Sequence, residues 1–310
     1  MENSIVKVEH LSHRYTVQWA VKDINFEIQK QGIYGLLGSN GAGKSTMMNI
    51  ICGVIKQTKG DVFIDGINAG TDPIVAKQCI GFLPQKPPLY DELTVEEYLT
   101  HTAELRRMPD DQVKAAVDEA LDMCTITHFR KRLIKNLSGG YQQRVGIAQA
   151  IIHKPKIVIF DEPTNGLDPN QIVEIRNLIK NIAQDRTVIL STHILSEVQA
   201  ICDYILMIEQ GQLIFQGEMD KFNNYILPSS MIVSLANAPV TSELQNIPGV
   251  NGVEELGGSR FRLHFDDAEQ VAEQLVDLSM TRHWHLTELS LEKCSLETIF
   301  AALSKECQNN

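Results

Sequence analysis

The segment Gly38–Ser45, with the sequence Gly-Ser-Asn-Gly-Ala-Gly-Lys-Ser, constrains the fold of this chain more than any other. An apolar stretch typical of a strand, Ile33–Leu37, precedes it, and apolar residues at helical spacing follow it from Met48 to Ile55. A strand, a glycine-rich loop and a helix in this order favour phosphate binding, because backbone N–H groups and the positive end of the helix can surround phosphate oxygens. We therefore expect an α/β fold built around a nucleotide.

The chemistry of the loop residues suggests their roles. Lys44 is expected to reach the terminal phosphates, and the hydroxyl of Ser45 is expected to ligate Mg²⁺. Glycines are required where a side chain would block the approach of the backbone to phosphate. The candidate nucleotide contacts are Gly38, Ser39, Asn40, Gly41, Ala42, Gly43, Lys44, Ser45 and Thr46.

Two acids, Asp161 and Glu162, follow the apolar stretch Ile157–Phe160. Ligands bind at the carboxyl edge of parallel sheets, so both carboxylates should lie beside the phosphate site. Asp161 is predicted to hold the Mg²⁺ shell. Glu162 is predicted to take a proton from an attacking water, which lowers a barrier by about 3–5 kcal/mol. Without the phosphate loop, the pair could equally mark a buried strand that meets solvent.

A second candidate anion site is Ser138-Gly139-Gly140, which precedes a helical pattern with Val145, Ala148 and Ile152. The serine and the glycine N–H groups would lie at the N-terminus of that helix, with no lysine. Taken alone, the tripeptide fits an ordinary serine cap followed by glycines in a turn at least as well.

Composition excludes several classes of protein. The 310 residues suffice for two domains, and their formal net charge of −11 disfavours non-specific binding to nucleic acid. No apolar run approaches the roughly 20 residues that cross a bilayer, and the polar start is unlike a secretory signal. The six cysteines are scattered without a Cys-x-x-Cys pair, which argues against a zinc or disulfide scaffold and fits a reducing compartment.

The pattern along the chain predicts two domains. Residues 1–220 alternate β-like and helical segments, as a parallel α/β core does, except that a helical subdomain without strands occupies about 85–137. Thr94-Val95-Glu96-Glu97 is a capping box for one helix of that subdomain, and Pro109 opens another. The core should end in a hairpin, Tyr204–Ile208 with Leu213–Phe215.

Residues 221–230 are predicted to form a linker, and residues 231–310 a C-terminal accessory domain. Its segments follow the order βαββαβ of a ferredoxin-like α+β domain, and a final helix comes after them. The expected elements are strand Met231–Leu235, helix Thr241–Ile247, strand Val253–Leu256, strand Phe261–Phe265, helix Ala268–Leu278, strand Trp284–Leu289 and helix Ser295–Leu303.

The octapeptide Leu137–Arg144, Leu-Ser-Gly-Gly-Tyr-Gln-Gln-Arg, resembles the signature motif of the ATP-binding-cassette (ABC) ATPases. The phosphate loop and the acid pair stand at that family's order and spacing, so the resemblance covers roughly residues 4–218. It implies a P-loop NTPase core with an N-terminal antiparallel β subdomain, and ATP and Mg²⁺ as cofactors. Tyr141 departs from the glutamine usual at its position, which leaves any partner-specific role of that side chain open.

The resemblance also implies roles for further residues. Gln85 resembles the glutamine that senses Mg²⁺ and the attacking water, and His193 resembles the switch histidine that contacts the γ-phosphate. Tyr15 resembles the aromatic residue that stacks on adenine. The segment Gly166-Leu167-Asp168 resembles the loop that crosses to a second subunit, and Asp168 is the candidate contact within it. In this family ATP lies between one subunit's phosphate loop and the signature loop of the other, so a homodimer, or a heterodimer with a related ATPase, is implied.

The expected function is that of the ATPase subunit of an ABC transporter, peripheral on the cytoplasmic side of a membrane and bound to separate permease subunits. Ser295–Phe300 resembles the tail of drug- and polymer-export ATPases, which favours export. The alternative is a soluble ABC ATPase that acts as a mechanical switch on a non-membrane partner. A metabolic kinase would share the phosphate loop but would leave the signature motif and His193 unexplained.

Overall fold

The computed structural model describes residues 4–226, 228–292 and 295–309 and divides the chain into two units. The first comprises Met1–Met219 with Leu303–Asn310, and the second comprises Asp220–Ala302. The division after Met219 lies one residue before the end of the core expected from the sequence. In the described ranges, no helix combines the length and apolar character that a membrane span requires.

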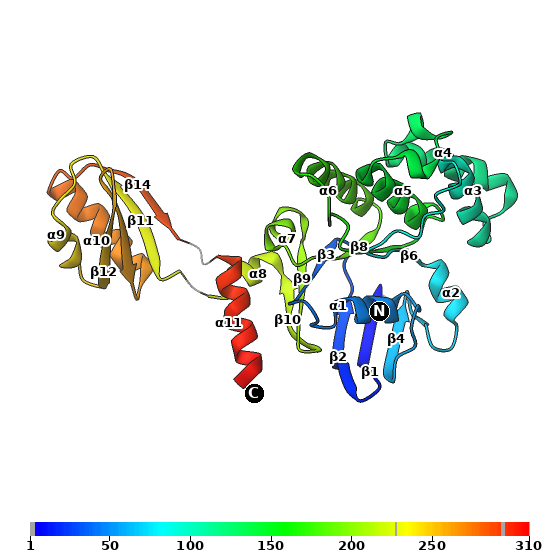
Figure 1. The fold of residues 1–310 in the computed structure, drawn as a ribbon. Helices are drawn as coiled ribbons and strands as arrows, with labels where there is room; N and C mark the ends of the chain where they lie inside the picture. The colour runs from blue at the N-terminus through cyan, green and yellow to red at the C-terminus, as the bar shows by residue number, and fades with distance from the viewer. Residues whose placement is uncertain (1–3, 227, 293–294, 310) are drawn as a thin grey trace. The chain divides into compact units, whose positions relative to one another are not determined.

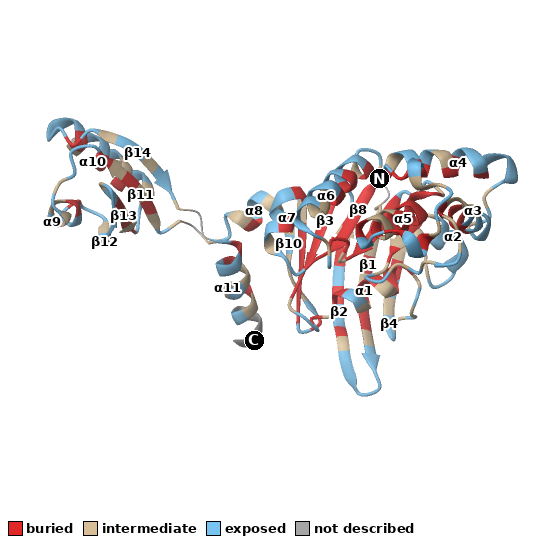
Figure 2. Cartoon of the chain, turned by 45° about the horizontal axis from the view of Figure 1, so that its top comes forward, coloured by how far each residue is buried: buried red, intermediate tan, exposed pale blue. Residues whose placement is uncertain are grey.

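A six-stranded sheet forms the centre of the first unit, with the strand order β10-β9-β3-β8-β7-β6 (Figure 1). Its strands from β9 to β6 run parallel, and β10 pairs antiparallel with β9. Every residue of β3, β7 and β8 is buried, as expected for strands covered on both faces (Figure 2). The strands are β3 (Ile33–Leu37), β6 (Ile80–Leu83), β7 (Ile157–Asp161), β8 (Thr187–Ser191), β9 (Tyr204–Glu209) and β10 (Gln212–Glu218).

Four helices connect the parallel strands: α1 (Lys44–Ile51), α5 (Gly139–Ile151), α6 (Pro169–Ala183) and α7 (Leu195–Ile201). The buried face of α6 carries Ile175, Leu178, Ile179 and Ile182. Helix α5 lies very close to β6, since a Cβ added at Gly81 would come within 2.0 Å of the Ala150 carbonyl oxygen. These helices and strands place the phosphate loop, the acid pair and His193 at one edge of the sheet, because the carboxyl ends of parallel strands coincide.

A second, antiparallel sheet has the order β2-β1-β4-β5 and confirms the antiparallel subdomain that the resemblance implies. Its strands are β1 (Val6–Tyr15), β2 (Gln18–Ile28), β4 (Lys59–Ile64) and β5 (Ile67–Asn68), and the short helix α2 (Pro73–Gln78) follows. The parallel strand β3 and helix α1 therefore come between β2 and β4 in the chain. The apolar face of this sheet shares a core with α1 and the parallel sheet.

The helical region is confirmed, since no strand lies between β6 and α5 in the described chain. It contains α3 (Val95–Leu105), α4 (Asp110–Met123) and two short 3₁₀ turns, Thr127–Phe129 and Ile134–Asn136. The predicted capping box is present: the Thr94 hydroxyl accepts from the Glu97 N–H, while the Glu97 carboxylate accepts from the Thr94 N–H.

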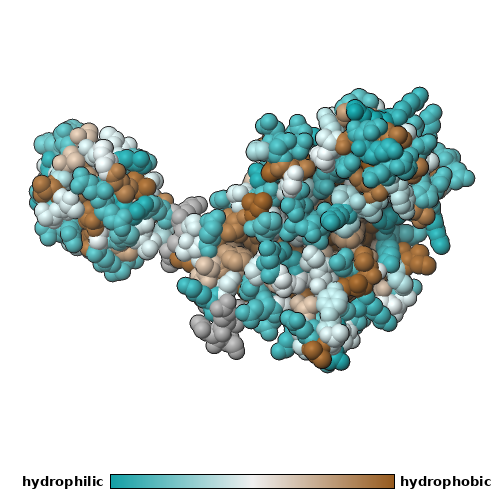
Figure 3. Space-filling model, viewed as in Figure 1, coloured by the Kyte–Doolittle hydropathy of each residue, from teal (hydrophilic) through white to brown (hydrophobic). Residues whose placement is uncertain are grey.

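The molecular face in Figure 3 is mostly hydrophilic, with small hydrophobic patches.

The C-terminal unit has the predicted βαββαβ order, and its antiparallel sheet has the strand order β12-β13-β11-β14. Counted within the unit, this is the 4-1-3-2 order of a ferredoxin-like sheet, read from β14. Leu235, Phe261, Leu263 and Leu275 are among the side chains of its core. The elements within the unit are β11 (Ser230–Leu235), α9 (Thr241–Gln245), β12 (Val250–Gly257), β13 (Arg260–Phe265), α10 (Ala268–Thr281) and β14 (Leu286–Leu291). Helices α8 (Met219–Asn223) and α11 (Leu296–Asn309) each extend across a division between the two units.

Several boundaries in this part of the chain differ from the prediction, among them those of the linker, the last strand and the final helix. Helix α8 occupies the start of the segment 221–230 that was expected to be a linker. The last strand begins at Leu286 rather than at Trp284, because His283 and His285 adopt positive φ angles of 58° and 56°, which no regular strand contains. The final helix continues to Asn309, beyond its expected end at Leu303.

Candidate functional site

The phosphate loop after β3 needs glycine at three positions. A Cβ at Gly38 would lie 2.2 Å from the carbonyl oxygen of Ile208 on β9, and a Cβ at Gly43 would lie 2.5 Å from that of Ala20 on β2. Gly41 and Gly43 also have φ angles of 84° and 108°, which L-residues rarely adopt. Close backbone packing against β9 and β2 therefore fixes the conformation of this loop, and glycine is required at these positions.

Lys44, the first residue of α1, folds its side chain back into the loop. Its ammonium donates hydrogen bonds to the carbonyl oxygens of Gly38 at 2.7 Å and Ser39 at 3.0 Å, and the residue is 6% exposed. Burial lowers the pKa of Lys44, while the carboxylates of Glu162, Asp161 and Glu209 oppose that shift. A largely dehydrated cation thus lies within the loop that was predicted to bind phosphate.

Two oxygen donors lie together beside the loop. The Ser45 hydroxyl is 3.4 Å from Oδ1 of Asp161, a carboxylate that is 6% exposed and also accepts a hydrogen bond from the Ser191 hydroxyl. A hydroxyl and a carboxylate fit Mg²⁺, which prefers hard oxygen ligands and shares its shell with water and phosphate. The described residues contain no group of three or more His, Cys, Asp or Glu side chains that could hold a metal by themselves.

Glu162 is the centre of a polar cluster. Its carboxylate accepts hydrogen bonds from Nε2 of Gln85 at 2.9 Å and Nδ2 of Asn165 at 3.2 Å, and it lies 3.1 Å from Nδ1 of His193. Its backbone has a φ of 48°, and its N–H donates to the carbonyl and hydroxyl oxygens of Ser191 on β8. The chain therefore holds a strained residue in place so that its carboxylate meets groups from three separate loops.

The structure brings Gln85, Glu162 and His193 together, although they are far apart in the sequence. Each follows the carboxyl end of a neighbouring strand: Gln85 follows β6, Glu162 follows β7 and His193 follows β8. The side chain of Glu162 is 14% exposed and that of His193 is 46% exposed, so the cluster opens toward solvent on the histidine side. An acid, an amide and an imidazole at this edge can orient a water and accept its proton.

The Ser138-Gly139-Gly140 segment starts α5 and forms a separate site. Ser138 is exposed and its side chain caps no helical N–H, while a Cβ at Gly139 would meet nothing within 4 Å. In the described part of the chain, no hydrogen bond joins these residues to the phosphate loop. Ser138 therefore lies at the N-terminus of α5 without the side-chain hydrogen bond that an ordinary serine cap makes.

Two further candidates also lie apart from the phosphate loop. Asp168 caps α6, where its Oδ1 accepts from the N–H groups of Asn170 and Gln171, both at 3.0 Å. Tyr15 lies at the end of β1, is 53% exposed, and contacts the ring of His13 edge-on at 4.8 Å. Tyr141 packs edge-on against Phe129, with 4.5 Å between the ring centroids.

Sequence reasoning missed three polar residues that support the site. Glu209, at the end of β9, accepts from the Ser39 hydroxyl at 2.7 Å, and Ser191 bridges the two acids. Glu197 is a buried carboxylate on α7. The only sequence signals were an acid at the end of an apolar strand and a Ser-Thr pair before His193.

Known proteins resemble this chain in sequence and in fold. The profile of the family described as ABC transporter matches residues 21–165. The bacitracin transport ATP-binding protein BcrA of Bacillus licheniformis is 38% identical over 220 residues, which cover 70% of this chain and 71% of the relative. The linearmycin resistance ATP-binding protein LnrL of Bacillus subtilis (strain 168) is 30% identical over 305 residues, which cover 97% and 98% of the two chains.

Solved structures show the same fold in the first unit. CbiO1 from Clostridium perfringens, part of the ABC transporter complex CbiONQ, superimposes with a TM-score of 0.66 and 31% identity, over 72% of this chain and 92% of its own. The dimeric cassette MJ0796, bound to ADP and Pi, gives a TM-score of 0.62 and 28% identity, over 69% and 98%. The motifs, the fold and these relatives together show that the chain belongs to the ATP-binding subunits of the ABC transporter family and is an ATPase.

Proposed function

We propose that this chain is the ATP-hydrolysing subunit of an ABC exporter, and that Glu162 is its general base. The observation that carries the proposal is the contact of the Glu162 carboxylate with both Gln85 and His193 beside Lys44 and Asp161. Glu162 would accept a proton from the attacking water, while Gln85 and His193 orient that water and the γ-phosphate. Ser45, Asp161 and Gln85 would hold Mg²⁺, which neutralises phosphate charge when bound.

Each active site is proposed to form between two copies of the chain, or between this chain and a related ATPase. The phosphate loop and Ser138–Gly140 are both anion sites, and no hydrogen bond links them within the described chain. A partner would bring its own Ser138–Gly140 to the ATP held on Lys44, and Asp168 would lie in the contact. The relative MJ0796 is dimeric with ADP and Pi, which supports this arrangement. ATP would close the dimer, and hydrolysis would reopen it.

Glu162→Gln tests the catalytic assignment. The amide oxygen can still accept from Gln85 and Asn165, but the amide cannot act as a base, so hydrolysis should fall by about 10²–10⁴-fold while ATP still binds. Size-exclusion chromatography with ATP should then show a trapped dimer. Glu218→Gln, on an exposed carboxylate, is the matched control. Turnover near the wild-type value in Glu162→Gln would remove Glu162 from the mechanism.

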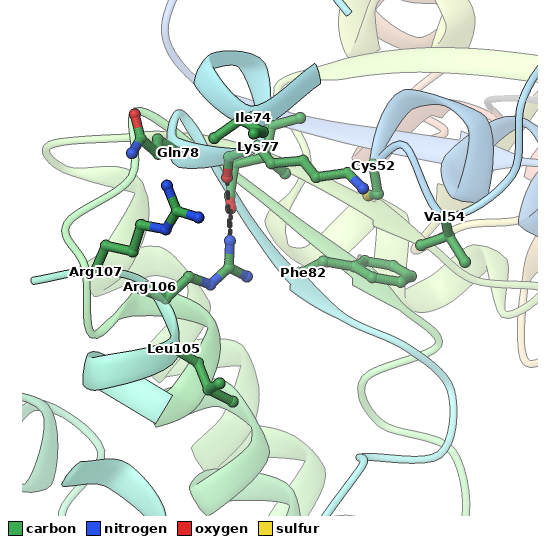
Figure 4. Close-up of a pocket in the computed structure, with 10 residues that line it drawn as sticks. Cys52, Val54, Ile74, Lys77, Gln78, Phe82, Leu105, Arg106 and Arg107 are labelled. Atoms are coloured by element: carbon green, nitrogen blue, oxygen red, sulfur yellow. Dashed lines mark hydrogen bonds between the residues drawn. The ribbon is translucent and has the colours of Figure 1, made fainter. Parts of the chain in front are cut away.

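A groove next to the helical region is proposed to receive a helix of a separate permease (Figure 4). Its volume is about 420 Å³, and it lies between the end of α1, α2, β6 and the end of α3. Val54, Ile74 and Leu105 provide exposed apolar surface, and Lys77 and Arg107 provide positive charge. Arg106 is held in place by hydrogen bonds to the carbonyl oxygens of Lys77 and Ile80. An amphipathic helix with acidic residues would complement this surface.

Export is the direction that the relatives support. The names of BcrA and LnrL assign them to bacitracin transport and linearmycin resistance, and SrtF of Streptococcus pyogenes, 33% identical over 231 residues, is a lantibiotic transport protein. We accordingly place this chain at the cytoplasmic side of a membrane, as a peripheral subunit with residues 231–310 as an accessory domain. Nucleic acid is not among its proposed partners, given the net charge of −11.

Affinity capture from detergent-solubilised native membranes separates the exporter from a soluble switch. Tagged Glu162→Gln with ATP should capture a multi-spanning protein in near-equal amount. Leu105→Glu should abolish that capture by placing a charge in the groove, whereas Met280→Glu, on an exposed residue of α10, should not. Capture of soluble proteins alone, with ATP binding intact, would favour the soluble switch.

A further inference from the structure

Helix α7 carries a buried carboxylate, Glu197, that is 2% exposed. One of its oxygens, Oε2, accepts hydrogen bonds from the hydroxyl of Thr164 at 2.7 Å and the hydroxyl of Thr192 at 3.0 Å. The other, Oε1, lies 3.7 Å from Nη2 of Arg176 and has no hydrogen bond. Both threonines are themselves buried.

The two threonines belong to the two loops that carry the cluster around Glu162. Thr164 lies two residues after Glu162, and Thr192 immediately precedes His193. Oε2 of Glu197 is therefore a common anchor on the protein side of these loops, while the 3.1 Å contact between Glu162 and His193 joins them on the solvent side. The Thr192 hydroxyl also accepts from the N–H of Ile194, which fixes the backbone just beyond the histidine.

A stabilising role in α7 alone does not account for this arrangement. An acid in the first turn of a helix favours the helix dipole, but that effect is available at an exposed position without burial. A buried carboxylate is costly unless its oxygens are hydrogen bonded, and here the donors come from outside α7. The energy of burying Glu197 is thus offset by contacts that fix the spacing of two catalytic loops.

We propose that Glu197 is a positioning residue that holds Glu162 and His193 in register through Thr164 and Thr192. Neither threonine has a hydrogen bond to the phosphate loop Gly38–Thr46 in the described chain. Loss of the anchor should therefore reduce kcat and leave the KM for ATP almost unchanged. The inference rests on the proposed function, since it takes Glu162 and His193 as the catalytic pair.

Glu197→Met tests the anchor because it keeps the volume and removes both acceptor oxygens. We expect kcat to fall by about tenfold to a hundredfold, with KM for ATP within about twofold of wild type. Glu197→Gln keeps an oxygen that can accept from both threonines, so it should restore most of the turnover lost in Glu197→Met. Glu119→Met, on an exposed ion pair with Lys154, is the matched control.

A double variant distinguishes positioning from a general loss of structure. In the background of His193→Ala, where the pair is already broken, Glu197→Met should reduce kcat little further, whereas a structural defect would add its full effect. Should Glu197→Met fail to fold, Thr164→Val and Thr192→Val each remove one donor and should reproduce the selective loss of kcat.

Two outcomes would overturn the proposal. One is a kcat of Glu197→Met within twofold of wild type, and the other is an equal loss in Glu197→Gln and Glu197→Met, which would assign the effect to charge. If Glu162→Gln and His193→Ala keep their turnover, the proposed function itself fails. If they lose turnover while Glu197→Met and the valine variants keep it, only the positioning role fails.

Discussion

Lys44 should contribute most of the charge that attracts ATP, and Lys44→Met measures that contribution. Methionine keeps most of the apolar stem and removes the ammonium. In the structure this ammonium donates to the carbonyl oxygens of Gly38 and Ser39, so it exchanges two hydrogen bonds for others when it turns to phosphate. The hydrogen bonds that the ammonium loses and gains therefore contribute little net free energy to ATP binding. The main remaining contribution of Lys44 is the Coulomb attraction between its ammonium and the phosphate.

The size of the remaining attraction follows from the burial of Lys44. The residue is 6% exposed, so its ammonium loses little further hydration when a phosphate arrives. Two unit charges 4 Å apart attract by about 4 kcal/mol at an effective dielectric constant of about 20. That energy corresponds to about a thousandfold in Kd. Because burial lowers the pKa of Lys44, the wild-type affinity should also decline as the pH rises into the alkaline range.

Fluorescence titration with a labelled ATP analogue gives the two dissociation constants, at pH 7 and again at alkaline pH. Lys30→Met removes the same charge from an exposed side chain, 71% accessible and 3.5 Å from Glu218, and should leave Kd unchanged. The loss of ATP affinity at alkaline pH should be present in wild type and in Lys30→Met and absent in Lys44→Met. A Kd for Lys44→Met within threefold of wild type would refute the electrostatic reasoning.

Three other changes have definite expected outcomes. Gly81→Ala places a Cβ 2.0 Å from the Ala150 carbonyl oxygen and should lower the free energy of unfolding by about 3 kcal/mol, measured in urea. Burial and Arg106 lower the pKa of His153 to about 4, so the unfolded chain takes up a proton between pH 6.5 and 4 that the folded chain does not. Stability should therefore fall by about 3 kcal/mol over that range, and less in His153→Gln. Leu263→Ala, in the core of the C-terminal unit, should cost about 2–5 kcal/mol, visible by calorimetry.

Local patterns predicted much of the fold correctly. The bounds of β3 coincide with the expected strand Ile33–Leu37, and the capping box at Thr94 begins α3 as predicted. These elements depend on neighbours in the sequence, so their signals are complete within a few residues. The antiparallel strand β4 had no residue-level prediction, because it pairs with β1, whose partner residues lie about 50 positions away, from Val6↔Ile64 to Ser12↔Lys59.

The same distinction applies to the site. Lys44, Asp161 and Glu162 were identified from short motifs whose chemistry requires those residue types in that order. The contacts of Glu197 with Thr164 and of Glu209 with Ser39 join residues 33 and 170 positions apart. No spacing rule relates such residues, since they come together only because β9, β3, β8 and β7 are neighbouring strands of one sheet.

The antiparallel sheet is assembled from chain segments on both sides of the phosphate loop. Strand β1 pairs with β4 from Val6↔Ile64 to Ser12↔Lys59. In the sequence, β3, the phosphate loop and α1 all lie between these two paired strands. A ligand that stabilises the loop must therefore oppose the separation of β1 from β4, by the linkage between binding and local unfolding. ATP should accordingly slow amide hydrogen exchange along β1 and β4, and the opening of this sheet becomes a reporter of nucleotide occupancy.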